Sequence, residues 1–310
     1  RSGAPVMSTS LRTTSVPAAR AGDHEVPWRT PKRDRPAARA KRYAFSAFLW
    51  ALGILFLVPF AWMVSSSLKS NLDVFQIPVR WIPENPQWQN YIDVWTGSKS
   101  IGRYFVNSII VSSISVVGDL LTAAMAGYAF ARLHFKGRDK VFLIYLATTI
   151  VPFQLLLIPR FMLFRQIGIY NTLWALILPG IFTVFGTFLL RQFFIGVPPE
   201  LGEAARIDGA SEWRVFWNVY LPQAKPILAA LAIIQFVGSW NNYESPLIML
   251  STEARYTLPL GLTVFVDADG GLSAGLAMAA SVSSILPVFV VFLIFQRQFV
   301  ESMVHAGLRG

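Results

Sequence analysis

The 310-residue chain is 54% hydrophobic and only 14% charged, and its mean hydropathy is +0.48. A soluble domain would carry about a quarter charged residues, so a soluble enzyme or binding module is excluded. The chain has no cysteine, which excludes disulfides, thiol catalysis and cysteine metal sites. Its formal net charge of +10 does not require a nucleic-acid partner, because membrane topology explains where the positive residues lie.

Residues 1–42 are rich in Ala, Pro, Arg, Ser and Thr and are predicted to form a disordered cytoplasmic tail. A basic cluster at the end of this tail comes directly before the first apolar run, where it can contact anionic lipid. The cluster consists of Arg29, Lys32, Arg33, Arg35, Arg39, Lys41 and Arg42. We therefore expect the tail to contact the membrane surface and no nucleic acid.

Residues 43–310 are predicted to form a transmembrane domain. Four apolar runs carry no charge, and two more carry a single acid each, Asp119 and Glu244. About twenty helical residues cross the hydrocarbon core of a bilayer. The expected spans are residues 43–64, 104–131, 141–161, 172–194, 226–250 and 274–296. The first span is too long for the apolar core of a cleaved signal, so we expect it to remain as an anchor.

The orientation of these spans follows from the positive residues in the connecting segments. With both termini inside, the cytoplasmic segments hold 20 of the 27 lysines and arginines, and the outer segments hold 7. Positive residues that flank spans stay in the cytoplasm. The sequence thus predicts an all-α integral membrane protein with six transmembrane helices and both termini cytoplasmic.

The longest outer loop, residues 65–103, contains Trp81, Trp88 and Trp95. Tryptophans in such a place favour a membrane–water boundary, with a docking surface as the second interpretation. No stretch of the chain fits the phosphate-binding pattern G-x-x-x-x-G-K-[ST]. If ATP drives this protein, a different chain must bind the nucleotide.

A polar loop at residues 198–222 lies between the fourth and fifth expected spans, on the cytoplasmic side. Pro198 and Pro199 can begin a helix, and Gly209 can end it in the left-handed conformation. Ser211 can then cap a second helix, with Glu212 placed favourably in its first turn. The sequence therefore predicts a short helix–turn–helix.

The second of these helices carries four large aromatic residues. Their spacing of i, i+3, i+4 and i+7 predicts one continuous face, after which Pro222 is expected to end the helix. The four residues are Trp213, Phe216, Trp217 and Tyr220. The loop could rest on lipid headgroups or dock on a partner, and small residues at Ala204 and Ala205 would permit a close approach. From the residues alone, docking on a partner and resting on lipid are about equally supported.

The same loop resembles the EAA signature of ABC importer permeases. The matching pattern is Glu203-Ala204-Ala205, three residues, Gly209, nine residues, Val219, one residue, Leu221-Pro222. Six of the seven signature positions match, and Val219 stands where isoleucine is usual. The resemblance implies that the loop is a coupling helix that sits in a cleft of an ATP-binding subunit. The implied coupling residues are Glu203, Ala204, Ala205, Arg206, Asp208, Gly209, Leu221 and Pro222.

Four further stretches resemble carbohydrate-uptake permeases of the maltose type, so that the resemblance covers residues 43–310. They are GYAFARLHFKGRD, GTFLLRQFF, SWNNYESPL and FQRQFVESMVHAGLRG. Asp119, Glu244 and His305 depart from the pattern of that family.

This resemblance implies a permease subunit of an ATP-driven importer for a sugar or polyol. The implied location is a bacterial or archaeal plasma (inner) membrane, crossed several times. The implied partners are a homologous permease, two ATP-binding subunits and an extracytoplasmic sugar-binding protein. The chain itself is expected to be no enzyme and to bind no cofactor, with ATP and Mg²⁺ held by the ATPase subunits.

Polar residues inside the expected spans are a second set of candidates. An acid in a span costs roughly 2.5–3.5 kcal/mol on insertion scales and normally faces a cavity or a partner. The candidates for a substrate pathway are Asp119, Gln235, Asn241, Asn242 and Glu244. The competing interpretation is hydrogen bonding between helices or to the partner permease.

Two other classes of function remain open. Asp119 and Glu244 could carry protons in a secondary transporter, although such proteins usually show repeated halves and none is visible here. A membrane scaffold without transport is the other class, and it would tolerate substitution in the loop.

Overall fold

The computed structural model describes residues 36–97, 100–265 and 274–307, and these residues form helices and no strands. The chain divides into two units, Arg1–Leu55 and Phe56–Gly310. Residues 1–35 of the expected tail lie outside the described residues. Helix α1 (Pro36–Ser67) begins before residue 43, where the first span was expected to start. Proline is favoured at a first helical position, and the alanines after it propagate a helix well.

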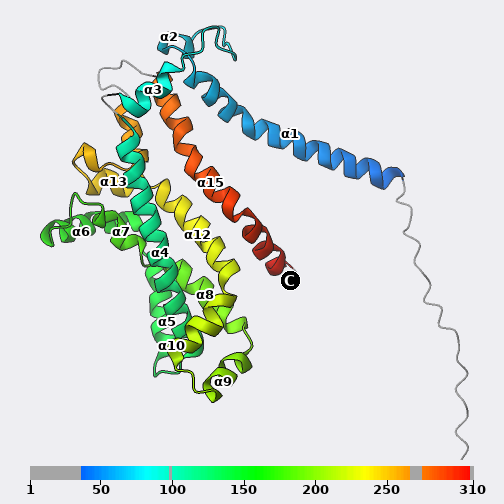
Figure 1. The fold of residues 1–310 in the computed structure, drawn as a ribbon, viewed down its shortest axis with the longest axis vertical. Helices are drawn as coiled ribbons and strands as arrows, with labels where there is room; N and C mark the ends of the chain where they lie inside the picture. The colour runs from blue at the N-terminus through cyan, green and yellow to red at the C-terminus, as the bar shows by residue number, and fades with distance from the viewer. Residues whose placement is uncertain (1–35, 98–99, 266–273, 308–310) are drawn as a thin grey trace, which may run out of the picture. The chain divides into compact units, whose positions relative to one another are not determined.

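The helices of the second unit follow α1 in the order of the chain (Figure 1). They are α2 (Asn71–Val74), α3 (Gln89–Thr96), α4 (Gly102–Arg132), α5 (Arg138–Ala147), α6 (Phe153–Gln166), α7 (Trp174–Gly180), α8 (Val184–Gly196), α9 (Pro199–Ile207), α10 (Glu212–Val215), α11 (Leu221–Gln223), α12 (Lys225–Trp240), α13 (Glu244–Met249), α14 (Leu258–Gly261) and α15 (Ala274–Gly307). Three 3₁₀ turns, Thr148–Ile150, Glu253–Arg255 and Leu262–Phe265, and one π-helical turn, Phe216–Tyr220, complete the described structure.

Helix α4 is the centre of the second unit, because α7, α8 and α12 all pack against it. The approach of α8 depends on small residues: a Cβ atom on Gly127 would lie 2.9 Å from the Leu190 Cβ. Helix α15 in turn packs against α12 and α3. Small residues at such contacts let helix backbones come close, which is how helices pack in the absence of a hydrophobic driving force.

The described helices include four that are long and apolar enough to cross a membrane, namely Lys41–Ser67, Gly102–Arg132, Trp174–Gly196 and Ala274–Ile294. Two bent pairs raise the number to as many as six, Arg138–Ile150 with Phe153–Gln166 and Glu212–Gln223 with Lys225–Trp240. Six spans were expected, and three of them, the third, fourth and fifth, are not single continuous helices.

The third expected span, residues 141–161, bends by 97° between α5 and α6. Val151 is extended because it precedes Pro152, and a residue before proline is disfavoured in the α conformation. The fifth expected span, residues 226–250, was also wrong in its extent, since α12 ends at Trp240. The Asn242 Oδ1 accepts a hydrogen bond from the Ser245 amide at 3.1 Å, which starts α13 as a separate short helix.

The fourth expected span, residues 172–194, is built from α7 and α8 with a short break at residues 181–183. Thr183 ends the break because its side chain accepts a hydrogen bond from the Gly186 amide and caps α8. The break leaves backbone groups of α7 available to side chains from neighbouring helices.

Candidate functional site

The loop at residues 198–222 has the helix–turn–helix structure that its sequence predicts. Helix α9 begins at Pro199, and Gly209 after it has φ 80°. The Ala210 amide donates to the Ala205 carbonyl, and the Gly209 amide donates to the Arg206 carbonyl. These two bonds are the ones that end a helix through a left-handed residue, a conformation that glycine adopts without strain.

The second helix of the loop starts at its predicted cap. The Ser211 side chain accepts a hydrogen bond from the Arg214 amide at 3.4 Å. Pro222 does not end this helix, contrary to expectation, because α11 continues to Gln223. The chain turns instead at Ala224, with a bend of 76° into α12.

The aromatic residues of the second helix lie together, as expected for one face, but only two of the four are buried. The ring of Trp213 lies 5.8 Å from the ring of Phe216 and 5.7 Å from the ring of Trp217. Phe216 and Tyr220 are buried, with 2% and 1% of their surfaces exposed. Trp213 and Trp217 remain 59% and 36% exposed. Phe216 and Tyr220 are four residues apart, as are Trp213 and Trp217, so the buried pair lies on one side of the face and the exposed pair on the other. The residues from Phe216 to Tyr220 form a π-helical turn within this helix.

The buried aromatic residues attach the loop to α4. The ring of Tyr128, on α4, lies 5.2 Å from the ring of Phe216 and 5.2 Å from the ring of Tyr220. Helix α9 then packs on Tyr220 through Gly202, where a Cβ atom would lie 2.7 Å from the Tyr220 Oη. Only glycine fits at position 202 while Tyr220 keeps this place.

A polar network joins the two helices of the loop to each other and to α4. The Arg206 Nε and Nη2 donate to the two oxygens of Glu212, at 2.5 and 3.2 Å. The Tyr128 Oη donates to the Glu212 Oε2 at 2.7 Å. The hydrogen bonds from Arg206 hold the pKa of the Glu212 carboxyl below its ordinary value, and the one from Tyr128 acts in the same direction. Glu212 is therefore a carboxylate at neutral pH and keeps both partners.

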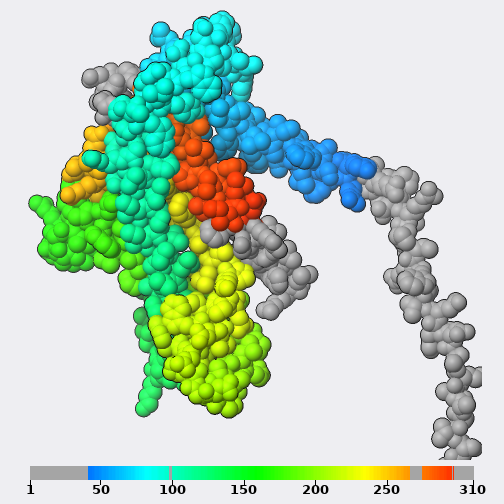
Figure 2. Space-filling view, in the orientation of Figure 1, coloured from blue at the N-terminus to red at the C-terminus, as the bar shows by residue number. Residues whose placement is uncertain are grey.

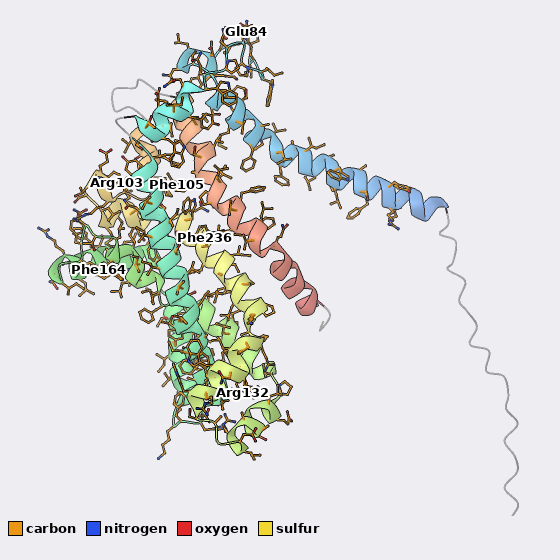
Figure 3. All side chains as sticks on the ribbon, viewed as in Figure 1. Glu84, Arg103, Phe105, Arg132, Phe164 and Phe236 are labelled. Carbon is orange, nitrogen blue, oxygen red and sulfur yellow. The ribbon has the colours of Figure 1, made fainter. Side chains whose placement is uncertain are left out.

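Arg132, the last residue of α4, secures the entry to the loop (Figure 3). Its Nε donates to the Phe194 carbonyl at 2.9 Å, and its Nη2 also donates to the Val197 carbonyl. Its guanidinium carbon lies 5.1 Å from the ring centroid of Tyr220. A cation that bonds the last carbonyls of a helix also complements the negative end of the helix dipole. Arg132 thus fixes the end of α8 just before α9 begins.

Sequence reasoning did not select Tyr128, Arg132 or Gly202 as functional residues. A signal for the first two was present, because they are four residues apart near the end of α4 and so share one helix face. The contact of Gly202 with Tyr220 could not have been read from the sequence, since it depends on how α9 packs against the second helix of the loop.

The opposite side of the loop is exposed and partly apolar. Ile207 is 86% exposed and Leu201 is 45% exposed. Both belong to α9, which lies in the yellow-green part of Figure 2. Further exposed residues of the loop are Glu203, Ala204, Asp208, Gly209 and Pro222. Exposed apolar side chains rimmed by polar ones are typical of a protein interaction site.

The two alanines of the loop lie on different sides of α9. Ala204 is exposed, whereas Ala205 is half-buried and packs, as Leu221 does, against the buried cluster that includes Tyr220. Arg206 is half-buried and held by Glu212. Of the predicted coupling residues, Ala205, Arg206 and Leu221 therefore hold the loop to the membrane domain, and the others face outward.

Three of the five polar residues predicted within the spans have structural contacts. Asp119 is fully buried and accepts a hydrogen bond from the Thr183 Oγ1 at 2.6 Å. The Gln235 Nε2 donates to the Gly180 carbonyl at 3.1 Å, so both residues hold the break between α7 and α8. Asn242 caps α13, as described above. These contacts match the interpretation of hydrogen bonding between helices.

The remaining two, Asn241 and Glu244, are exposed. The Glu244 Oε2 accepts a hydrogen bond from the Nε2 of Gln154, a residue in the first turn of α6 that the sequence did not bring forward. The structure thus separates the five predicted pathway residues into a buried or half-buried set with structural contacts and an exposed set.

Comparison with known proteins places these features in a family. Residues 120–305 match the family model described as "Binding-protein-dependent transport system inner membrane component". The chain is 36% identical to the arabinooligosaccharides transport system permease protein AraQ of Halalkalibacterium halodurans, over 86% of this chain and 94% of that one. It is 34% identical to the diacetylchitobiose uptake system permease protein NgcG of Streptomyces coelicolor, over 90% of this chain and 93% of that one.

The fold also resembles a solved structure. A bacterial ABC transporter involved in the import of the acidic polysaccharide alginate contains a chain that superposes with a TM-score of 0.76 at 23% identity. The superposition covers 86% of this chain and 98% of that one. At this identity the likeness establishes the fold.

Proposed function

Because this chain belongs to the family of binding-protein-dependent transport system inner membrane components, we propose that it is one permease subunit of an ATP-driven importer for a sugar or related polyol. It is a transport component and not an enzyme. The observation that carries the proposal is the loop at residues 198–222, whose base is fixed to α4 while Ile207 projects outward.

The substrate class is supported by the relatives. Their names give arabinooligosaccharides, diacetylchitobiose, lactose and sn-glycerol 3-phosphate as substrates of systems that contain a similar permease. Most of these are uncharged sugars. Exposed amide and carboxylate groups, such as those of Asn241 and Glu244, are suited to bond sugar hydroxyls.

The assembly we propose contains this chain, a homologous permease, two ATP-binding subunits and an extracytoplasmic binding protein. Closure of the ATPases on ATP would move the docked loop, and the network through Glu212 and Tyr128 would carry that motion to α4. The spans would then change between inward-open and outward-open states. The chain would lie in a bacterial or archaeal plasma (inner) membrane with both termini in the cytoplasm.

Substitution of Asp119 by asparagine distinguishes this proposal from a proton-coupled transporter. The assembled complex in vesicles should keep ATP-driven uptake within about twofold, because the Thr183 Oγ1 can donate to an amide oxygen as it does to the carboxylate. Asp119→Leu is the matched control, which removes the acceptor and should lower the amount of assembled complex. Uptake that survives ATP depletion, or that Asp119→Asn abolishes while assembly is normal, would support proton coupling instead.

The proposed orientation is tested by single cysteines, which are clean reporters because the chain has none of its own. A cysteine at Asn85, exposed in the long outer loop, should react in intact cells with a membrane-impermeant thiol reagent. A cysteine at Asp208, exposed in the loop after α9, should react only after the cells are permeabilised. The reverse pattern would place the termini outside.

A further inference from the structure

Two breaks in the expected spans meet at one place in the described structure. The first is the 97° bend before α6, and the second is the non-helical stretch 241–243 before α13. Helices α6 and α13 pack together, and Phe164 of α6 and Met249 of α13 belong to the same buried cluster. Polar ligands of membrane transporters are typically bound where interrupted helices expose polar groups within the membrane.

Polar side chains from the two breaks contact each other at an exposed position. The Gln154 Nε2 lies 3.4 Å from the Glu244 Oε2, and both residues are exposed. The second oxygen of Glu244 and the Oε1 of Gln154 have no other hydrogen bond among the described residues. The side chain of Asn241, just before α13, is likewise exposed and makes no hydrogen bond within those residues. The side chains of Gln154, Asn241 and Glu244 can therefore each form further hydrogen bonds, for example to a ligand.

The chemistry of this place is that of a site for hydroxyl groups. Phe153 and Tyr243 each precede one of the polar residues and are 37% and 39% exposed, which offers apolar surface for the face of a sugar ring. No basic side chain of the described residues lies within ion-pair distance of Glu244. Arg160 is the nearby cation of α6, and its guanidinium carbon lies 4.7 Å from the Phe153 ring centroid.

We propose that Gln154, Asn241 and Glu244 form a contact site for an uncharged, hydroxyl-rich ligand at the meeting point of the two breaks. The inference rests on the proposed function and narrows it, because it gives Gln154 a role and excludes an acidic sugar or a sugar phosphate at this site. The carboxylate of Glu244 accepts two hydroxyl protons but repels an anionic group. Asp119, Gln235 and Asn242 are structural and do not belong to the site.

The experiment uses single cysteines beside the site, at Leu155 and Leu247, so that Gln154, Asn241 and Glu244 stay intact. Leu155 is 68% exposed and Leu247 is 52% exposed. The control cysteine is at Gln166, which is exposed at the other end of α6. The chain is assembled with its partner permease, ATPases and binding protein, and the rate of modification by a small thiol reagent is measured during ATP turnover. The neutral probes are lactose, diacetylchitobiose and arabinooligosaccharides, and the anionic probe is sn-glycerol 3-phosphate.

A transported neutral probe should slow modification at residues 155 and 247 by about tenfold, as expected for positions beside a bound ligand, and should leave residue 166 unchanged. Glu244→Gln should lower uptake of that probe by about tenfold, since it loses a charged acceptor. Three outcomes would each overturn the inference. They are equal protection by sn-glycerol 3-phosphate, protection of residue 166 as well, and no protection while uptake is measurable. If the wild-type complex takes up no neutral probe with ATP, the proposed function itself fails.

Discussion

Ile207→Asp is expected to abolish ATP-driven uptake while the permease still inserts and pairs with its partner. The side chain is 86% exposed in the isolated chain, so the substitution removes no internal contact. Burial of an isoleucine side chain in a cleft of an ATPase would contribute about 2 kcal/mol, and a carboxylate buried there without a partner would add a further penalty. Binding of the ATPase should therefore weaken by more than about 30-fold. The measurements are uptake and co-purification of the ATPase.

Ile207→Leu is the matched control, because it keeps the volume and apolar character of the side chain and should keep most of the uptake. Ala205→Trp is a second variant for comparison. The sequence alone would suggest that it blocks docking, but Ala205 packs against the buried cluster that includes Tyr220. A tryptophan there should therefore damage the structure of the loop itself. Normal uptake by Ile207→Asp would show that the exposed tip of α9 does not dock on an ATPase.

Glu212→Ala is expected to separate ATP hydrolysis from transport. The substitution removes the acceptor shared by Arg206 and Tyr128, while the exposed tip of α9 keeps its residues. The ATPase should still bind and hydrolyse ATP, but uptake should fall by at least about tenfold, because loss of hydrogen bonds to a charged group loosens the link between the loop and α4. The quantity to compare is the amount of sugar transported per ATP hydrolysed.

Tyr128→Phe isolates the link to α4, because it keeps the aromatic packing and removes only the hydroxyl. It should reduce the transport ratio in the same direction and less severely. The double variant should be no worse than Glu212→Ala alone, since both act on one contact. Loss of ATPase binding in Glu212→Ala would instead show that this residue belongs to the docking surface.

The network should be insensitive to pH in the physiological range. The pKa of Glu212 is lowered by its bonds to Arg206, so the stabilisation is present above the ordinary pKa of a glutamate. It is lost only as the pH falls through the lowered value in the folded state. A change of coupling between pH 6 and 8 must therefore come from other groups.

Much of the loop could be predicted from its sequence, because its features are local. The proline start of α9, the positive φ of Gly209 and the Ser211 cap each depend on a residue type and its immediate neighbours. The sequence placed the aromatic residues on one face but could not show which of them are buried, since that depends on packing against Tyr128 of α4. Short-range rules also do not indicate where a helix widens into a π-helical turn.

The expected spans show the same division. The length of each apolar run gave the approximate position of each span. The break before Pro152 and the end of α12 at Trp240 depend on backbone geometry, which hydropathy does not measure. The sequence selected the polar residues as unusual for a span, but it could not indicate their contacts, which differ from one residue to the next. Asp119 is buried against Thr183, whereas Glu244 is exposed beside Gln154.

The π-helical turn at Phe216–Tyr220 has a consequence for how this loop can change in evolution. In this turn the Leu221 amide bonds to the Phe216 carbonyl, five residues back, so the helix holds one residue more than an α-helix of the same rise. Deletion of a single residue here would restore the α-helix and leave the residues before and after the turn in nearly the same relative orientation, because the turn takes up the extra residue. A one-residue deletion within Phe216–Tyr220 should therefore be better tolerated among homologous chains than a deletion elsewhere between Ser211 and Pro222.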